Sequence, residues 1–235
     1  MQHAVVTHED WLAARRDLLQ KEKELTHLRD SVANERLALP WERIEKDYVF
    51  DTLDGPRSLA GLFEGRSQLV VQHFMLAPGW KEGCPSCSFM ADHTDGMNLH
   101  LANHDVTMIA VSRAPLADIE RYRKRMGWTF GWVSSFGSDF NYDFRVSFTP
   151  EEVATGHIDY NFGGWNMTGE EWPGVSAFIK NEAGEVFRTY STYGRGVEVM
   201  MGTYAMLDLT PKGRNEARGM DWVRRHDRYE QAPGN

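Results

Sequence analysis

The sequence has 235 residues, of which 41% are hydrophobic and 26% charged, and its formal net charge is −8. This is the composition of a globular protein that can bury a sizeable core. An acidic balance argues against sequence-independent binding to nucleic acid, which needs a basic face. No apolar run approaches the roughly 20 residues that span a bilayer, and residues 1–10 lack the pattern of a secretory signal. We therefore expect a cytoplasmic protein that binds neither nucleic acid nor membrane.

The first predicted element is a long helix over residues 7–38. Thr7 is suited to cap it, with Asp10 completing a capping box, and Pro40 ends it. One face carries apolar residues seven positions apart, which is an amphipathic pattern: Trp11, Leu18, Leu25 and Val32. Two interpretations remain open: the helix packs on its own domain, or it forms a homodimer through this face. The pattern is too short and irregular to predict a coiled coil.

The part of the chain after the helix alternates apolar strands with helices. Asp54 and Gly55 mark a turn, Gly96 marks an expected kink, and Gly127 is suited to end a helix. Residues 134–172 are irregular, aromatic and rich in glycine, and their order is left open. The expected strands cover 48–50, 68–75, 106–111, 128–133, 175–179 and 186–190, and the expected helices cover 84–102, 115–126 and 197–207.

This order of elements predicts the fold class. Two right-handed β-α-β crossovers, followed by an antiparallel hairpin and a helix, give a mixed sheet with helices on both faces. That is an α/β, thioredoxin-like three-layer fold with a mixed central sheet, a long N-terminal helix and an irregular insertion before the final hairpin. We expect three parts: the amphipathic helix over 1–40, the thioredoxin-like domain over 41–210, and a charged tail over 211–235 with Trp222 and Tyr229 as anchors.

The chain has only two cysteines, and they lie three positions apart in the run Cys84-Pro85-Ser86-Cys87. In a cytosolic protein such a pair indicates redox chemistry or a metal site. Proline is favoured at the first position of a helix, so Cys84 is predicted to be the N-cap residue and Cys87 to lie one turn inside. The helix N-terminus stabilises a thiolate. Cys84 is therefore the expected attacking thiol, and Cys87 resolves the mixed disulfide.

Zinc is the alternative interpretation of the cysteine pair. A structural zinc site normally has four nitrogen or sulfur ligands, so His93, His100 and His104 would have to complete it. These histidines fall downstream on the same predicted helix, away from its N-terminus. An ordinary polar helix face explains them better, and we expect no metal and no other cofactor.

Three further positions carry candidate roles. His73 lies on the expected central strand shortly before the motif, where it would exchange protons with Cys87 near neutral pH; the alternative is a histidine satisfied within the core. Arg113 follows a strand and would either meet an anionic substrate or form a surface ion pair. Aromatic residues near strand ends would either line a substrate groove or belong to the core: Trp80, Trp128, Trp132 and Phe136.

Long stretches of the sequence resemble a known family. The resemblance extends over nearly the whole chain, from the N-terminal helix to WVRRHDRY near the end, and its most specific stretches are LPWERIEKDYVFD, QLVVQHFMLAPGWKEGCPSCSFMAD, VSRAPL, RMGWTFGWVSSFGSDFNYDF, FRTYSTYGRG and LDLTPKGRNE. They are similar to the domain of unknown function family 899, whose members are described as predicted dithiol-disulfide oxidoreductases with a thioredoxin-like fold. The resemblance implies that Cys84 and Cys87 are the active pair, and it supplies no physiological substrate.

Two features depart from ordinary thioredoxins. Thioredoxins place a cis-proline facing the cysteines before the first strand of the final hairpin, whereas counting back from the hairpin here puts Gly174 or Val175 at that place, after Pro173. The loop between Trp80 and Cys84 is also longer than usual. The resulting candidate substrate groove comprises Trp80, Pro85, Ser86, Trp128, Trp132, Pro173 and Gly174.

The favoured function is thiol-disulfide exchange with a protein or small-molecule thiol or disulfide. One alternative is a thiol peroxidase, but Pro78 and Lys81 do not match the Pro and Thr that precede a peroxidatic cysteine. The other alternative is a non-catalytic binding module that keeps the fold, with passive cysteines.

Overall fold

The computed structural model describes residues 3–230, so the last five residues of the predicted tail lie outside the described part. Internal contacts divide the chain into two units, Met1–Pro40 and Trp41–Asn235. The segment after residue 210 belongs to the second unit. Within residues 3–230, every helix is too short or too polar to cross a membrane.

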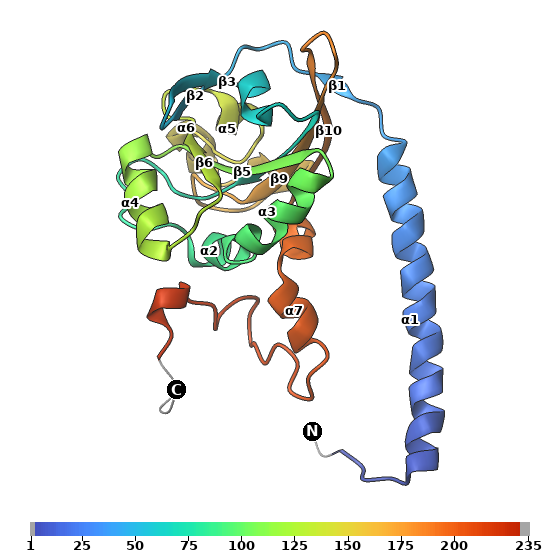
Figure 1. Ribbon diagram of the computed structural model, residues 1–235. Helices are drawn as coiled ribbons and strands as arrows, with labels where there is room; N and C mark the ends of the chain where they lie inside the picture. The colour runs from blue at the N-terminus through green and yellow to red at the C-terminus, as the bar shows by residue number, and fades with distance from the viewer. Residues whose placement is uncertain (1–2, 231–235) are drawn as a thin grey trace. The chain divides into compact units, whose positions relative to one another are not determined.

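The first unit is built on the helix α1 (His8–Leu37), drawn in blue in Figure 1. The predicted cap is present, because the Thr7 side chain accepts a hydrogen bond from the backbone N–H of Asp10 at 3.2 Å. None of the residues of α1 is buried. Trp11, Leu18 and Leu25 of the predicted stripe are 54%, 52% and 47% exposed.

The second unit contains an eight-stranded mixed sheet with the order β1-β10-β9-β4-β5-β6-β2-β3. β4, β5 and β6 are parallel, whereas β9 runs antiparallel to β4 and pairs with β10. The order β5-β4-β9-β10 is the thioredoxin-like core, with the motif following β4. The strands are β1 (Glu42–Arg43), β2 (Val49–Thr52), β3 (Gly55–Ser58), β4 (Gln68–His73), β5 (Val106–Ser112), β6 (Gly131–Ser134), β9 (Gly174–Lys180) and β10 (Val186–Tyr193), and a separate pair is formed by β7 (Ile158–Tyr160) and β8 (Gly163–Trp165).

Helices cover both faces of the sheet. The crossovers β4 to β5 and β5 to β6 move across the sheet in the same direction, and right-handed crossovers then place their helices on the same face. Figure 1 shows α2, α3 and α4 on that face and α5 and α6 on the other. The helical segments are η1 (Leu59–Phe63), α2 (Pro85–Ala91), α3 (Thr94–Asn103), α4 (Leu116–Met126), α5 (Phe140–Asp143), α6 (Pro150–Ala154), η2 (Gly194–Met200), α7 (Gly202–Leu207) and η3 (His226–Arg228).

Strand β4 explains the layered core, because successive side chains of a strand point to opposite faces. Leu69 and Val71 join an aromatic cluster on the α5 face, with Phe50, Phe63, Phe140, Phe144 and Phe178. Phe74 joins the cluster on the α4 face, which holds Cys87, Ile119, Tyr122, Trp128 and Trp132. The second cysteine of the motif is therefore part of the core.

The structure differs from the predicted helices at two places. The helix expected over 84–102 is divided into α2 and α3, and Gly96 lies inside α3 rather than at the break. At the break, the ring of His93 contacts the Phe89 carbonyl at 2.8 Å, and the His93 N–H donates to the Met90 carbonyl at 3.2 Å. The helix expected over 197–207 is likewise divided into η2 and α7, with non-helical Met201 between them.

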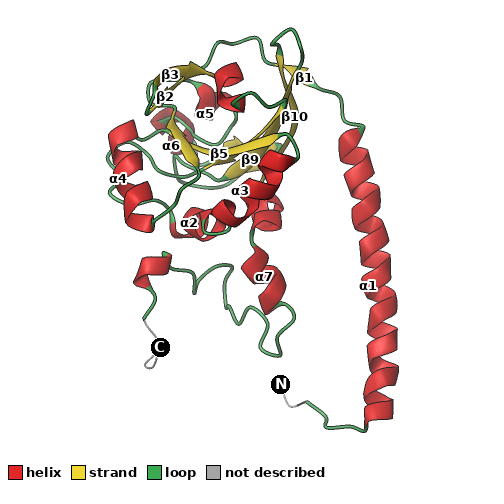
Figure 2. Cartoon of the chain, in the orientation of Figure 1, coloured by secondary structure: helices red, strands yellow, loops and turns green. Residues whose placement is uncertain are grey.

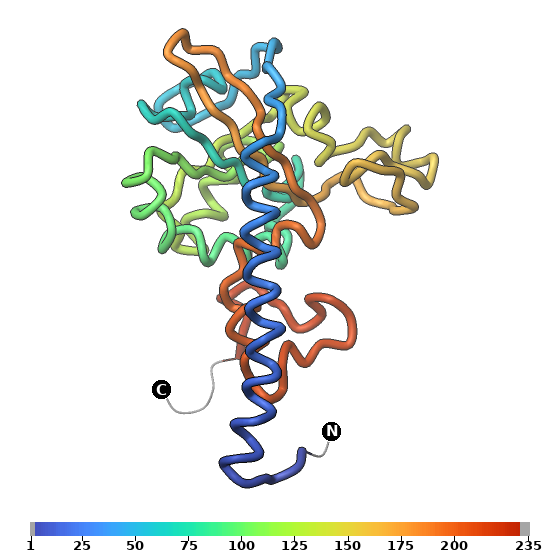
Figure 3. The backbone as a smooth tube through the Cα atoms, turned by 90° about the vertical axis from the view of Figure 1, so that its right-hand side faces the viewer, coloured from blue at the N-terminus to red at the C-terminus, as the bar shows by residue number. Residues whose placement is uncertain are grey.

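The region whose order was left open contains α5, α6 and the hairpin β7–β8. Figure 3 shows the yellow and light-orange part of this insertion reaching out to one side of the sheet. The expected strand at 128–133 begins only at Gly131, because Trp128 still bonds to the Arg123 carbonyl as part of the end of α4. Gly127 ends α4 with a φ of 71°, the left-handed conformation that glycine adopts readily.

Candidate functional site

Cys84 is the N-cap residue of α2, and Pro85 is the first residue of that helix. The Cys84 carbonyl accepts hydrogen bonds from the Ser88 N–H at 2.9 Å and from the Ser88 hydroxyl at 2.8 Å. The Cys84 N–H donates to the Met75 carbonyl at 3.1 Å, which fixes the motif to the end of β4. Gly83 is required just before it, since a Cβ there would meet the Phe74 ring at 2.5 Å.

The two thiols differ in environment. Cys84 is partly exposed, whereas Cys87 is 1% exposed. A hydrogen bond from the Cys87 thiol, helped by the N–H groups of Cys87 and Ser86, lowers the pKa of Cys84 to about 6. The same hydrogen bond, burial and the charge on Cys84 raise the pKa of Cys87 well above its usual value. At neutral pH the arrangement therefore holds one thiolate, on Cys84, and one thiol, on Cys87.

A cavity of about 510 Å³ opens beside the cysteines. Its walls are apolar and come from distant parts of the second unit: the end of β4, the start of α2, the insertion, η2 and the C-terminal segment. Five methionines line it: Met75, Met90, Met167, Met201 and Met220. Three aromatic residues complete the wall: Tyr160, Trp165 and Trp172.

A buried carboxylate makes the smallest of the contributions that raise the pKa of the inner thiol. Glu171 is 4% exposed, and its carboxylate accepts hydrogen bonds from Arg113 Nε at 2.7 Å and from the Ser147 hydroxyl at 2.9 Å. Burial raises the pKa of Glu171, while the charge of Arg113 opposes that shift. The negative charge on Glu171 is also one of the causes that raise the pKa of Cys87. Arg113 thus forms an ion pair, which was one of its two interpretations, but the pair is mostly buried and does not lie at the surface.

His73 is not brought to the cysteines. Its ring lies on the α5 face, 5.6 Å from Phe140 and 5.5 Å from Phe144, and its Nε2 lies 2.8 Å from the Ser176 hydroxyl. Burial lowers the pKa of His73 to about 3, so it is neutral at physiological pH. The neighbouring Gln72 faces the motif instead, and its side-chain amide donates to the Cys87 carbonyl at 3.2 Å.

The predicted groove residues and aromatic candidates fall into three sets. Ser86 and Pro173 line the cavity with both cysteines, and Pro85 and Gly174 are adjacent in sequence to lining residues. Trp128 and Trp132 are 7% and 3% exposed within the core, so they do not form a groove. Trp80 and Phe136 are exposed and do not line the cavity. β9 begins at Gly174, so Pro173, rather than Gly174 or Val175, directly precedes the strand.

Sequence reasoning missed the groups that the insertion contributes. Tyr160, Trp165, Trp172 and Glu171 all lie in the stretch whose order was left open. The one indication in the sequence was their aromatic character, because aromatic side chains in an irregular, glycine-rich stretch are expected to pack against another part of the protein. Nothing local indicated that they would reach the cysteines.

The C-terminal segment, mostly loop in Figure 2, holds the turn before Cys84. Arg225 donates from Nε and Nη2 to the Gly83 carbonyl at 3.0 and 2.6 Å, and it forms an ion pair with Glu82 at 3.0 Å. Arg228 contacts the same carboxylate at 3.1 Å. Trp222, one of the two expected anchors, packs against Phe89 of α2.

The zinc alternative finds no support in the described residues. Between residues 3 and 230, no three His, Cys, Asp or Glu side chains gather closely enough to hold a metal ion. His93 contacts Phe89 and Thr203 through its two ring nitrogens.

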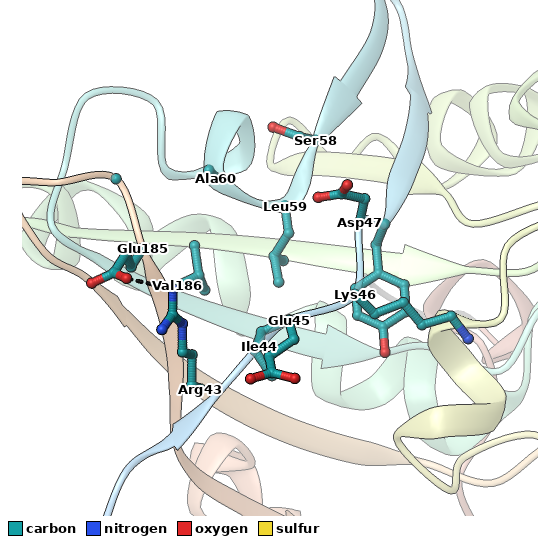
Figure 4. A pocket seen from close by; sticks show the side chains of 12 residues that line it. Arg43, Ile44, Glu45, Lys46, Asp47, Ser58, Leu59, Ala60, Glu185 and Val186 are labelled. Carbon is teal, nitrogen blue, oxygen red and sulfur yellow. Dashed lines mark ion pairs between the residues drawn. The ribbon is translucent and has the colours of Figure 1, made fainter.

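A second hollow, of about 450 Å³, lies beside β1 and η1 and is drawn in Figure 4. Its two basic residues are engaged in ion pairs: Arg43 with Glu185 at 2.6 Å, and Lys46 with Asp139 and Asp143 at 2.7 and 2.8 Å. Neither cysteine lines it. We therefore place the candidate site at the cavity beside Cys84.

Residues 1–229 match the family DUF899, described as a bacterial protein of unknown function. The chain belongs to this family. No curated protein matches it.

Several solved structures are similar to this DUF899 member in fold. The peroxidoxin BcpB from Mycobacterium tuberculosis is 12% identical with a TM-score of 0.47, over 70% of this chain and 95% of its own. A PrxQ cysteine mutant from Xylella fastidiosa is 12% identical with a TM-score of 0.43, over 68% and 88%. A putative protein disulfide isomerase from Bacteroides thetaiotaomicron is 16% identical with a TM-score of 0.37, over 76% and 94%. The likeness is distant, and the fold assignment rests on the strand order given above.

Proposed function

We propose that this DUF899 member is a thiol-disulfide oxidoreductase in which Cys84 attacks and Cys87 resolves. One observation carries the proposal: Cys84 is partly exposed at the N-cap of α2, whereas Cys87 lies inside the first turn and is 1% exposed. The pKa shifts of the two thiols run in opposite directions, as this difference in environment leads one to expect. A passive pair in a binding module needs no such difference. Perturbed pKa values beside a cavity are typical of functional sites.

The proposed reaction has two exchange steps. The Cys84 thiolate attacks a substrate disulfide R–S–S–R, forms a Cys84–S–S–R bond and releases one R–S⁻. Cys87 then loses its proton and attacks the Cys84 sulfur, which forms the Cys84–Cys87 disulfide and releases the second R–S⁻. The substrate is reduced by two electrons and the protein is oxidised by two. Run in reverse, the same steps oxidise a dithiol.

The first test is a redox titration of the dithiol against glutathione, with thiol labelling as the readout. A single two-electron transition is expected.

The second test is trapping of mixed disulfides. Cys87→Ser should accumulate mixed disulfides on Cys84, because the resolving thiol is absent, whereas Cys84→Ser, its matched control, should trap few. Thiols that never oxidise would favour the binding module. Equal trapping by the two variants, or adducts mainly on Cys87, would reverse the proposed roles. Faster oxidation by a hydroperoxide than by any disulfide would favour the thiol peroxidase.

Two further expectations belong to this proposal. The substrate is a thiol or disulfide, with no metal or other cofactor in the exchange steps. The proposed location is the cytoplasm, where thiols such as Cys84 and Cys87 are kept reduced between turnovers.

A further inference from the structure

The cavity beside Cys84 offers a substrate little besides apolar surface. The Tyr160 hydroxyl is already used, since it donates to the Pro173 carbonyl at 2.7 Å and accepts from the Gly194 N–H at 2.8 Å. Arg195 and Glu198, the charged residues that line it, form an ion pair with each other at 2.9 Å. The remaining lining side chains are mainly methionine and aromatic.

An extended polypeptide is poorly suited to this site. The Trp172 N–H beside Pro173 donates to the Val146 carbonyl at 2.8 Å, and the Cys84 N–H is bonded to Met75. β4 and β9, which end and begin beside the cysteines, both have neighbours on each side in the sheet. A peptide backbone buried here would lose its hydrogen bonds to water and would find these two N–H groups already used. Each group left unsatisfied is costly.

Building on the proposed exchange function, we propose that the substrate is a small disulfide whose organic group is apolar and enters this cavity. The sulfur bonded to that group then lies beside the Cys84 thiolate. A disulfide R–S–S–R gives two R–SH, and the protein gains the Cys84–Cys87 disulfide. Methionine side chains are flexible and polarisable, so they adapt to different alkyl or aromatic groups. A cavity of about 150 Å³ already holds benzene, and the space here is about 510 Å³.

The test compares simple disulfides in a single turnover of the reduced protein. Dimethyl, diethyl and dipropyl disulfide lengthen the apolar group one methylene at a time. Bis(2-hydroxyethyl) disulfide has the size of dipropyl disulfide but ends in hydroxyl groups. Each rate is divided by the rate of the same disulfide with N-acetylcysteine, which removes the intrinsic reactivity of the probe. Burying one methylene corresponds to up to about fourfold in rate, so dipropyl disulfide should exceed dimethyl disulfide by roughly tenfold.

Two matched aromatic variants on the β7–β8 hairpin localise the effect. Trp165 lines the cavity, whereas Phe162 is 76% exposed and does not. Trp165→Ala should flatten the dependence on chain length, and Phe162→Ala should leave it unchanged. Met167→Glu places a charge in the cavity and should reverse the preference for dipropyl over bis(2-hydroxyethyl) disulfide. If Trp165→Ala does not fold, this second variant still tests the same cavity.

The outcomes separate this inference from the function on which it rests. Normalised rates that are equal for all four disulfides, or a chain-length dependence that survives in both cavity variants, would overturn the apolar substrate class while leaving thiol-disulfide exchange in place. A dithiol that no disulfide oxidises would overturn both.

Discussion

The sulfur of Cys84 accepts hydrogen bonds from groups of its own motif, namely the Cys87 thiol and the N–H groups of Ser86 and Cys87. The two cysteines lie one helical turn apart, and only Cys84 is placed to accept these bonds. With a pKa of about 6, most of Cys84 is thiolate at pH 7, against a few per cent for a free thiol of pKa ~8.5. Intrinsic nucleophilicity falls with pKa, which offsets much of that gain. The advantage of Cys84 at neutral pH is therefore a few-fold over a free cysteine, and it grows as the pH falls.

We predict that the rate of iodoacetamide labelling of Cys84 rises through a midpoint near pH 6 in the Cys87-containing protein. The pKa is lowered, so the thiolate persists down to that pH and is lost below it. In Cys87→Ser a hydroxyl group takes the place of the thiol that donates to Cys84, and the pH midpoint of Cys84 labelling should differ from that of the wild type. Mass spectrometry of the labelled peptide provides the measurement. A wild-type midpoint near the ~8.5 of a free thiol would contradict the assigned hydrogen bonds.

The second residue-scale prediction concerns Glu171. Its negative charge contributes to the raised pKa of Cys87, so Glu171→Gln should lower that pKa and speed the resolving step at neutral pH. The step is followed by rapid quench after adding a disulfide. Glu170→Gln, which changes the 53% exposed neighbour, is the matched control and should have little effect.

His73→Leu belongs in the same experiment. If His73 exchanges protons with Cys87, as its place on the central strand suggested, the pH dependence of the resolving step will change in this variant. The position of its ring beside Ser176 and Phe140 favours an unchanged profile.

At the scale of elements, the N-terminus of α2 is fixed from two directions. β4 holds it through the bond between Cys84 and Met75, and the C-terminal segment holds the preceding turn through Arg225. The sequence predicts a tail anchored by Trp222 and Tyr229. In the structure, Arg225 and Arg228, which lie between these two residues, contact the turn before Cys84. A long surface segment is thereby tied to the site.

We predict that Arg225→Met loosens this turn. Hydrogen bonds to a charged group contribute roughly 1.5–3 kcal/mol, so the free energy of unfolding in urea should fall by about 1–3 kcal/mol. Trypsin should also cleave sooner after Lys81, which lies in the same turn. Arg121→Met is the control, because Arg121 forms an exposed pair with Asp118, and such pairs contribute about 0–1 kcal/mol. Equal effects of the two substitutions would show that the C-terminal segment does not hold the turn.

At the scale of the whole molecule, α1 is a helix of 30 residues of which none is buried, and Trp11, Leu18 and Leu25 of its apolar stripe are exposed. We propose that it forms a homodimer, since exposed apolar side chains on one helix face favour association with a similar face. Light scattering of the full chain should then give twice the mass of one chain. Deleting residues 1–40 should give the monomer mass.

Point variants separate the stripe from the rest of the helix. Leu18→Lys combined with Leu25→Lys should dissociate the dimer while circular dichroism retains the helical signal. Lys23→Glu, on the opposite face, should leave the mass unchanged. A monomer before and after deletion would contradict the proposed dimer.

The sequence by itself determined the elements whose signals are local. Thr7 and Pro40 bounded the first helix, the apolar run after Gln68 marked the central strand, Pro85 placed Cys84 at the start of a helix, and Gly127 ended α4. Each of these follows from backbone preferences within a few residues. The thioredoxin-like fold and the place of Cys84 and Cys87 at the start of a helix were predictable for that reason.

Only the tertiary structure decided what surrounds the dithiol. Glu171, Trp165 and Met220 lie about 80 to 135 positions after the motif, and no local pattern reports contacts at that separation. The same holds for the break between α2 and α3, where the His93 ring contacts both the Phe89 carbonyl and Thr203 of α7. A cavity is made by side chains from several elements that pack together, so its lining, and with it the substrate class that we propose, follows from the fold rather than from the motif.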